Sequence, residues 1–137
     1  MRLGFIGTGQ ITLSIINGIF KSKIKFKKIH ISPRNRLIAR NLSKKFKKVC
    51  IAKNNQELIE SSDWIFLAVT PKVGKKILGK LKFSNRKKII SLISTINLNQ
   101  LKNITKSKNV IKVIPLPFIG LRKGPIIVGS ENNQIKN

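Results

Sequence analysis

Two glycines near the amino terminus have the spacing of a phosphate-binding turn. Gly7 and Gly9 flank Thr8, directly after a short apolar stretch over residues 2–6. From residue 10 onward, apolar side chains recur at helical spacing, namely Ile11, Ile15, Ile16, Ile19 and Phe20. A strand, a glycine turn and a helix in this order let backbone N–H groups and the positive end of the helix face a pyrophosphate. The stretch therefore predicts the first unit of a dinucleotide-binding fold.

The three positions of this motif have different expected roles. Gly7 permits the tight turn, and Gly9 lets the backbone come close to the pyrophosphate. The third glycine of the usual motif is replaced by Thr12. That position mainly sets the packing of helix on strand, so a small residue can occupy it.

The residues that follow the second expected strand indicate which dinucleotide would bind. In NAD-binding proteins an Asp or Glu about 20 residues beyond the glycines holds the ribose 2′-hydroxyl. This chain has no acidic residue before Glu57, and Ser32, Arg34 and Arg36 stand in that region. Because a guanidinium pairs with phosphate oxygens through its planar fork, we predict a preference for NADP(H). The alternative is that these arginines are ordinary solvated cations.

Length and charge bear on the number of domains and on nucleic-acid binding. A chain of 137 residues suggests one domain. The net charge of +25 is typical of nucleic-acid binding, yet isoleucine, lysine and asparagine, which A/T-rich codons encode, make up 60 of the 137 residues. The lysines are also spread along the whole chain. We therefore expect no specific nucleic-acid partner, only some nonspecific attraction to polyanions.

The chain shows no sequence feature of export or of a membrane protein. Its apolar runs are far shorter than the roughly 20 residues that span a bilayer, and Met1-Arg2 leads straight into a strand. Cys50 is the one cysteine, and we expect it to fill space inside the core. These features predict a cytoplasmic protein without a disulfide or a membrane partner.

Strand and helix patterns alternate, which predicts an α/β fold with a doubly wound, mostly parallel sheet of the Rossmann type. The expected strands cover residues 2–6, 28–32, 49–52, 64–69, 88–93, 110–114 and 124–128. The expected helices cover 10–21, 36–46, 55–61, 73–80 and 98–103, and Asn35 is the expected N-cap of the second. Residues 1–128 would form the NADP-binding domain, and 129–137 a polar tail.

Several further stretches resemble the NADP-binding N-terminal domain of the pyrroline-5-carboxylate reductases. Asp63-Trp-Ile-Phe-Leu-Ala-Val-Thr-Pro71 is similar to the family pattern D-x-[IV]-x-L-A-V-x-P, and Asn55-Gln-Glu57 precedes it at the family's separation. Residues 89–96 and 112–115 resemble the next two strands. The likeness covers residues 1–128 and implies an NADPH-dependent reduction of a cyclic imine, as in proline synthesis.

The resemblance also implies a set of cofactor contacts at the ends of the expected strands. These are Ile6, Gly7, Thr8, Gly9, Gln10, Ile11, Ser32, Arg34, Asn55, Ala68, Val69 and Pro71. Four neighbouring positions complete the candidate set, namely Asn35, Arg36, Thr70 and Thr95. Thr70 and Thr95 stand where the family has a lysine and a glycine.

Two departures from the family concern the substrate. The family's polar P-N-T-P loop is Pro115-Leu-Pro-Phe118 here, and its C-terminal helical domain, which dimerises and supplies much of the substrate pocket, is absent. The chain would be a truncated or stand-alone cofactor domain, inactive alone, and a homodimer only with that domain. Two other classes stay open: a neighbouring Rossmann family, such as the hydroxyacid dehydrogenases or F420-dependent NADP reductases, and a non-enzymatic basic binding module.

The chain offers few groups for acid–base or metal chemistry. It has four acids and one histidine, His30, which lies within an expected strand. We therefore assign no catalytic residue and no metal site. This does not exclude a nicotinamide-dependent reductase, in which the cofactor carries the hydride chemistry.

Overall fold

Seven strands form one open sheet in the order β3-β2-β1-β4-β5-β6-β7. The computed structural model describes residues 1–115 and 126–129. Strands β1 to β6 are mutually parallel, whereas β7 pairs with β6 in the antiparallel sense. The strands are β1 Arg2–Ile6, β2 Lys28–Ile31, β3 Val49–Ile51, β4 Trp64–Leu67, β5 Lys88–Ser91, β6 Val110–Pro115 and β7 Ile126–Gly129.

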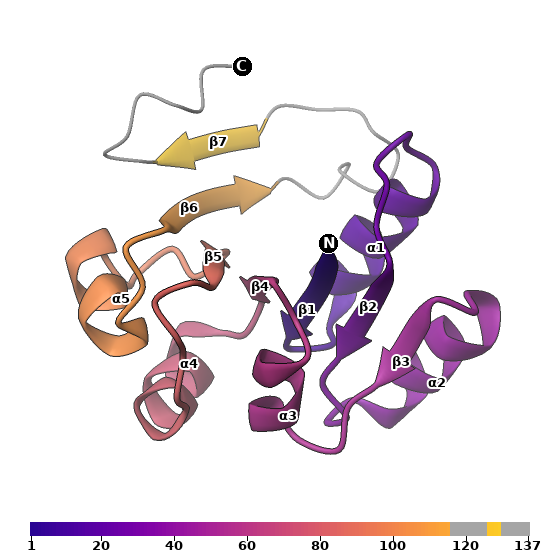
Figure 1. Ribbon diagram of the computed structural model, residues 1–137, viewed down its shortest axis with the longest axis horizontal. Helices are drawn as coiled ribbons and strands as arrows, with labels where there is room; N and C mark the ends of the chain where they lie inside the picture. Colours follow the sequence, from indigo (N-terminus) through magenta and orange to yellow (C-terminus); the bar gives the residue numbers. More distant parts are fainter. Residues whose placement is uncertain (116–125, 130–137) are drawn as a thin grey trace.

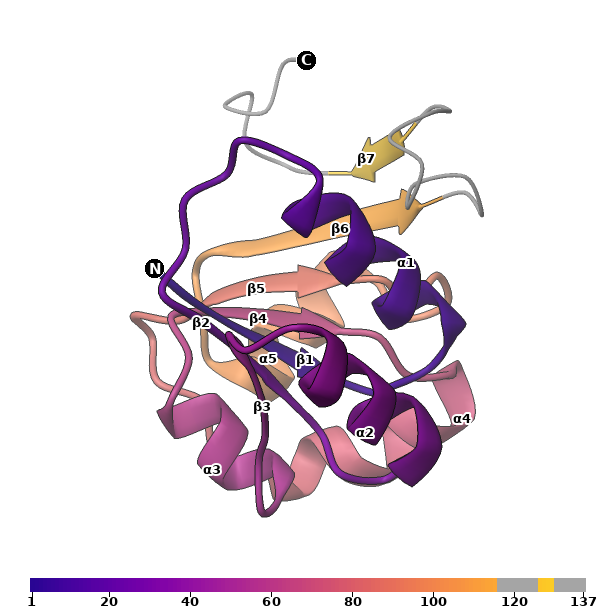
Figure 2. The same cartoon turned by 90° about the vertical axis from the view of Figure 1, so that its right-hand side faces the viewer.

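Helices cover both faces of the sheet (Figures 1 and 2). They are α1 Gln10–Phe20, α2 Arg36–Lys45, α3 Asn55–Glu60, α4 Pro71–Ile77 and α5 Leu98–Thr105, with a 3₁₀ turn, η1 Leu78–Lys80, after α4. Helices α1 and α2 pack on one face, and α3, α4 and α5 on the other. The predicted doubly wound, mostly parallel sheet is therefore confirmed.

Alternating side chains of the central strands supply the two cores. On the face of α1 and α2, Leu3 and Phe5 of β1 are buried, and the ring of Phe5 stacks on Phe66 of β4 at a centroid distance of 4.4 Å. On the opposite face, Ile65 and Leu67 of β4 are fully buried beneath α3 and α4. Because both faces of these strands are covered, their sequences are almost continuously apolar.

The order of the strands reverses beside β1. From β1 the chain winds outward through β2 and β3, and then crosses back to place β4 on the other side of β1. In open parallel sheets the loops on either side of such a reversal separate and leave a crevice at the carboxyl ends of the strands. The glycine turn between β1 and α1 lies at this point.

Four predicted strands end too late at the carboxyl edge. The strands predicted to end at residues 32, 52, 69 and 93 end at Ile31, Ile51, Leu67 and Ser91. In each case the chain turns away from the ladder after one more backbone hydrogen bond, such as that from Ala68 N to Ile6 O at 2.8 Å. The apolar sequence continues into the loops, so hydropathy alone misplaces these strand ends.

Other differences lie at the ends of helices. The helix predicted over 73–80 begins at Pro71, because Thr70 caps it and proline suits the first helical position, and its last turn is the 3₁₀ turn. Helix α5 continues to Thr105, and α1, α2 and α3 each end one residue early. Strand β7 includes Gly129, which was predicted to begin the tail, and residues 130–137 lie outside the described residues.

The predicted burial of Cys50 is wrong in part, because its side chain is only half-buried on the edge strand β3. No helix of the described residues is both long and apolar enough to cross a membrane.

Candidate dinucleotide-binding site

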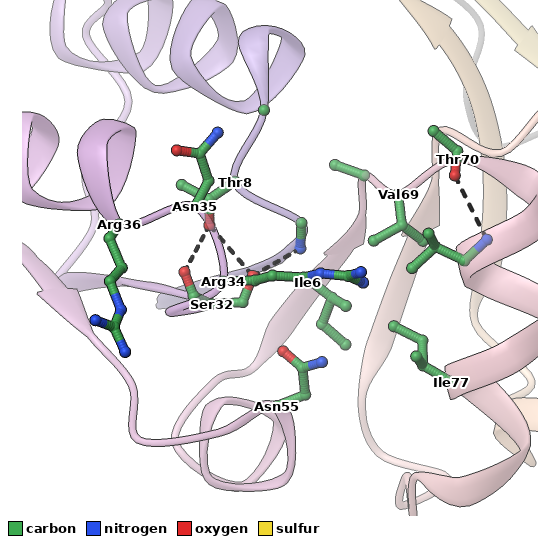
Figure 3. A pocket seen from close by; sticks show the side chains of 14 residues that line it. Ile6, Thr8, Ser32, Arg34, Asn35, Arg36, Asn55, Val69, Thr70 and Ile77 are labelled. Carbon is green, nitrogen blue, oxygen red and sulfur yellow. Dashed lines mark hydrogen bonds between the residues drawn. The ribbon is translucent and has the colours of Figure 1, made fainter.

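A cavity of about 660 Å³ lies at the carboxyl edge of the sheet, at the reversal beside β1 (Figure 3). It is bounded by the glycine turn, by the loop after β2 and by the start of α3. The loop after β4 and one face of α4 close the other side. The lining residues are Ile6, Gly7, Thr8, Gly9, Ser32, Arg34, Asn35, Arg36, Asn55, Ala68, Val69, Thr70, Val73 and Ile77.

The two glycines of the turn differ in what an added side chain would meet. Gly7 has φ of +101°, and a Cβ there would collide with the backbone carbonyl oxygen of Ala68 and lie 2.9 Å from Val69 Cγ1. A Cβ on Gly9 would meet no atom within 4 Å, so it would project into open space. Gly7 is therefore required by the fold, and Gly9 leaves room beside the cavity.

The amino end of α1 adjoins this open space. Gly9 is its N-cap and provides no side chain to accept a hydrogen bond from the first-turn N–H groups. Those donors, together with the positive end of an eleven-residue helix, are suited to an anion. Among the described residues, no carboxylate lines the cavity, so no formal negative charge of these residues opposes an anion there.

Three hydroxyl groups surround the glycine turn. The Gly7 N–H donates to Ser32 Oγ at 2.9 Å, and Thr8 Oγ1 donates to the Ser32 carbonyl oxygen at 2.7 Å. Thr12 Oγ1 donates to the Gly7 carbonyl oxygen at 2.6 Å. The side chain of Ser32 thus contacts the turn itself, and only 3% of this residue is exposed.

The cationic wall of the cavity follows β2. Arg34, Asn35 and Arg36 are all exposed, and Asn35 Oδ1 accepts a hydrogen bond from Ile38 N at 3.3 Å as the predicted N-cap of α2. In Figure 3 the side chain of Arg34 extends into the cavity toward Val69, whereas that of Arg36 lies on the side opposite Val69 and Thr70. Arg34 is therefore the cation best placed to meet a ligand.

The wall below contains an unpartnered polar atom. Asn55 Oδ1 at the start of α3 is buried and has no hydrogen-bond partner. A buried polar atom without a partner is costly, and most such atoms in proteins are satisfied by a ligand, water or protein group. A hydroxyl or amino group of a bound molecule would supply the missing donor.

Across the cavity, the loop after β4 leads into α4. Thr70 Oγ1 caps this helix by accepting from Val73 N at 3.4 Å. Val73 and Ile77 add an apolar surface that the sequence analysis missed. The signal was present, because Thr-Pro marks a helix start at Pro71 and places residues 73 and 77 on one face.

The structure brings together twelve of the sixteen candidate residues. The other four are Gln10 and Ile11, exposed on the first turn of α1, Pro71 at the start of α4, and Thr95, exposed between β5 and α5. Residues 116–118 of the expected substrate loop lie outside the described residues. The glycines, the free helix end, Arg34 and the orphaned Asn55 oxygen fit a dinucleotide.

Catalytic groups are sparse around this cavity. Within residues 1–115 and 126–129, no group of three or more His, Cys, Asp or Glu side chains could hold a metal ion. His30 lies within β2, and burial, reinforced by Lys28 and Arg2, lowers the pKa of its imidazole. It contributes no atom to the cavity wall.

The chain is similar in sequence to a known family of oxidoreductases. The family model described as "NADP oxidoreductase coenzyme F420-dependent" matches residues 2–97. A pyrroline-5-carboxylate reductase of Arabidopsis thaliana is 29% identical over 117 residues, which are 83% of this chain and 42% of that protein. The chain thus spans less than half the length of this curated relative.

Solved structures of two pyrroline-5-carboxylate reductases are also similar. That from Plasmodium falciparum, with NADP bound, superposes with a TM-score of 0.78 and 26% identity, covering 97% of this chain and 49% of the other. That from Streptococcus pyogenes has a TM-score of 0.77 and 22% identity, covering 98% of this chain and 51% of the other, and shows the common fold.

Proposed function

Because the chain belongs to the family of NADP oxidoreductases described as coenzyme F420-dependent, we propose that it binds NADP(H) in the cavity beside β1. The observation that carries this proposal is the pairing of an open glycine turn with a cation-lined wall to which none of the residues in 1–115 and 126–129 adds a carboxylate. The pyrophosphate would lie against Gly9 and the first N–H groups of α1. Asn55 Oδ1 would accept a hydrogen bond from the ligand.

We assign the 2′-phosphate to Arg34, with Arg36 as a second cation. Arg34 is exposed and extends into the cavity, and a guanidinium can form two parallel hydrogen bonds to one phosphate. Ser32 has less freedom to contact the phosphate through its side chain, because its hydroxyl accepts from Gly7. Its role at the site would be to hold the turn.

The reaction that we propose is reduction of a cyclic imine of the pyrroline-5-carboxylate type. Support comes from the similarity to pyrroline-5-carboxylate reductases in sequence and structure. When bound, NADPH supplies the hydride. This chain would hold the nucleotide and orient it through the glycine turn, while a further segment, such as the half that the relatives contain in addition, would hold the substrate. Homodimers would require that segment.

We further propose that the protein works in the cytoplasm. Its cysteine content supports this, since Cys50 is the one cysteine of the sequence and forms no internal disulfide. The competing interpretation, a non-enzymatic basic binding module, has less support because the charge is matched by no nucleic-acid motif.

Calorimetric titration with NADPH and NADH tests the proposed cofactor. A hydrogen bond to a charged group contributes about 1.5–3 kcal/mol, so NADPH should bind at least about tenfold more tightly than NADH. Arg34→Ala should remove most of this difference. Arg40→Ala is a matched control, because Arg40 is an exposed arginine of α2 that does not line the cavity. Equal affinities in the unaltered protein would overturn the assignment of the 2′-phosphate.

A further inference from the structure

The backbone of Gly7 is held on both sides by side-chain hydroxyl groups. Its N–H donates to Ser32 Oγ at 2.9 Å, and its carbonyl oxygen accepts from Thr12 Oγ1 at 2.6 Å. We propose that Thr12 and Ser32 are positioning residues that fix the phosphate-binding turn before a dinucleotide arrives. This inference rests on the proposed function, because it concerns the same cavity.

The three hydroxyl-bearing residues connect elements that are distant in sequence. Thr12 belongs to α1, Thr8 to the turn, and Ser32 to the loop after β2, 25 positions beyond Gly7. Thr8 Oγ1 donates to the Ser32 carbonyl oxygen at 2.7 Å and lies 3.2 Å from Ser32 Oγ. The turn is therefore tied to the carboxyl end of β2 as well as to its own helix.

Burial makes these hydrogen bonds strong determinants of the geometry. The exposed fractions of Thr12, Thr8 and Ser32 are 0%, 4% and 3%. Water therefore has little access to compete for the three hydroxyl groups, whereas Gly7, which lines the cavity, is half-buried. The Gly7 N–H or carbonyl that lost its hydroxyl partner would have to pair with water from the cavity side, and the turn would no longer be tied to α1 or to the end of β2.

Thr12 differs from the small residue of the usual motif because it carries a hydroxyl donor. A glycine or alanine there would fill the helix–strand contact but would offer no donor to the Gly7 carbonyl oxygen. Thr12 fills the contact, being fully buried, and provides the donor as well. The replacement thus adds a hydrogen bond that the ordinary motif lacks.

A turn fixed in this manner affects both nicotinamide cofactors alike. NADPH and NADH share the pyrophosphate, which would lie against the turn, and differ only at the 2′-phosphate, which we assign to Arg34. Loosening the turn should therefore weaken both cofactors by the same factor, because each would then have to order the turn on binding. A change at Arg34 should alter their ratio.

The test compares isosteric and hydroxyl-retaining variants in the full chain of 137 residues. Thr12→Val deletes the donor and keeps the shape, whereas Thr12→Ser keeps the donor and loses a methyl group. Thr105→Val is a matched control, since Thr105 is also fully buried in a helix and donates to a carbonyl, that of Leu101, away from the cavity. Titrations with NADPH and NADH are combined with amide hydrogen exchange at residues 7–10 of the ligand-free protein.

We expect Thr12→Val to weaken NADPH and NADH about equally, by roughly five- to tenfold, and to speed exchange in the ligand-free turn. Thr12→Ser should stay within about twofold of the unaltered protein, and Thr105→Val should change neither measurement. If Thr12→Val fails to fold, exchange in Ser32→Ala, which deletes the acceptor of the Gly7 N–H, gives the same test.

Three outcomes would overturn the inference. They are unchanged exchange in the turn of the hydroxyl-deleted variant, a loss in Thr12→Ser that equals the loss in Thr12→Val, and a shift of the NADPH-to-NADH ratio in Thr12→Val. If the unaltered protein binds neither cofactor, the proposed function fails. The exchange measurement would still decide whether the hydroxyl groups hold the turn.

Discussion

Alanine and valine substitutions at the two glycines of the turn should separate stability from binding. In Gly7→Ala the new Cβ would collide with the Ala68 carbonyl oxygen in a backbone conformation with φ of +101°. Such a conformation costs a non-glycine residue about 1–3 kcal/mol, and a forced overlap in a packed region costs about 1–3 kcal/mol more. The free energy of unfolding should therefore fall by about 2–6 kcal/mol.

Gly9→Val should have the opposite profile. Gly9 has φ of −108°, which any residue adopts, and its Cβ would touch nothing within 4 Å. Valine is a poorer N-cap than glycine, so we expect the free energy of unfolding to fall by no more than about 1 kcal/mol. The side chain would occupy the space proposed for the pyrophosphate, and NADPH affinity should fall by at least about 100-fold, or about 2.7 kcal/mol.

Urea unfolding and calorimetric titration of both variants decide the matter. Unfolding curves with unchanged slopes would show that the denatured states are comparable. The reasoning about the site would be refuted if Gly9→Val kept a native circular dichroism spectrum and bound NADPH with unaltered affinity. The reasoning about the fold would be refuted if Gly7→Ala were as stable as the unaltered protein.

Three further predictions concern charge, burial and turnover. Asp63 accepts hydrogen bonds from the Arg2 guanidinium at 3.0 Å and from the Arg2 backbone N–H at 2.8 Å, and these lower the pKa of the carboxyl group to about 2 from 3.8. The ion pair should stabilise the fold fully above about pH 4, and this stabilisation should be lost as the pH falls toward 2. Because the two side chains are about 45% exposed, it should amount to at most about 1 kcal/mol. Asp63→Asn should abolish this part of the acid dependence of unfolding. Asn55→Leu removes the unpartnered buried oxygen, so thermal unfolding should show unchanged or higher stability while NADPH affinity falls. A large loss of stability would mean that the oxygen has a protein partner. NADPH oxidation with pyrroline-5-carboxylate should stay at background for this chain alone, because little in it would hold the imine in a near-attack geometry, and turnover near 10 s⁻¹, the median for enzymes, would show a complete site.

The parts of the site that local sequence determines could be predicted, and those that depend on tertiary contacts could not. The roles of Gly7 and Gly9 follow from the order of strand, turn and helix, and Asn35 was recognised as an N-cap from its place before an amphipathic helix. The engagement of Ser32 by Gly7 could not be foreseen, because it requires the register that puts the end of β2 beside the turn. Hydropathy likewise extended β4 to Val69, since residues that line a cavity can be as apolar as residues in a ladder.

β4 pairs with β1 although the two strands are far apart in the sequence, and this separation affects folding. β1 is the first strand of the chain, yet it lies in the middle of the sheet, and Leu3 pairs with Trp64 on one side. Closing the 61 residues that separate them costs about 3.6 kcal/mol of chain entropy, estimated as (3/2)RT ln n, before any contact of β4 with β1 repays it.

Such long-range pairing slows folding, and during synthesis the sheet cannot be completed around β1 until β4 has been made. Until residue 67 has left the ribosome, the edge of β1 that later pairs with β4 has no partner. A nascent chain that pauses before this point would expose an unpaired strand edge, which promotes association with other chains. Maturation of this protein should therefore be more sensitive to the rate of translation before β4 than after it.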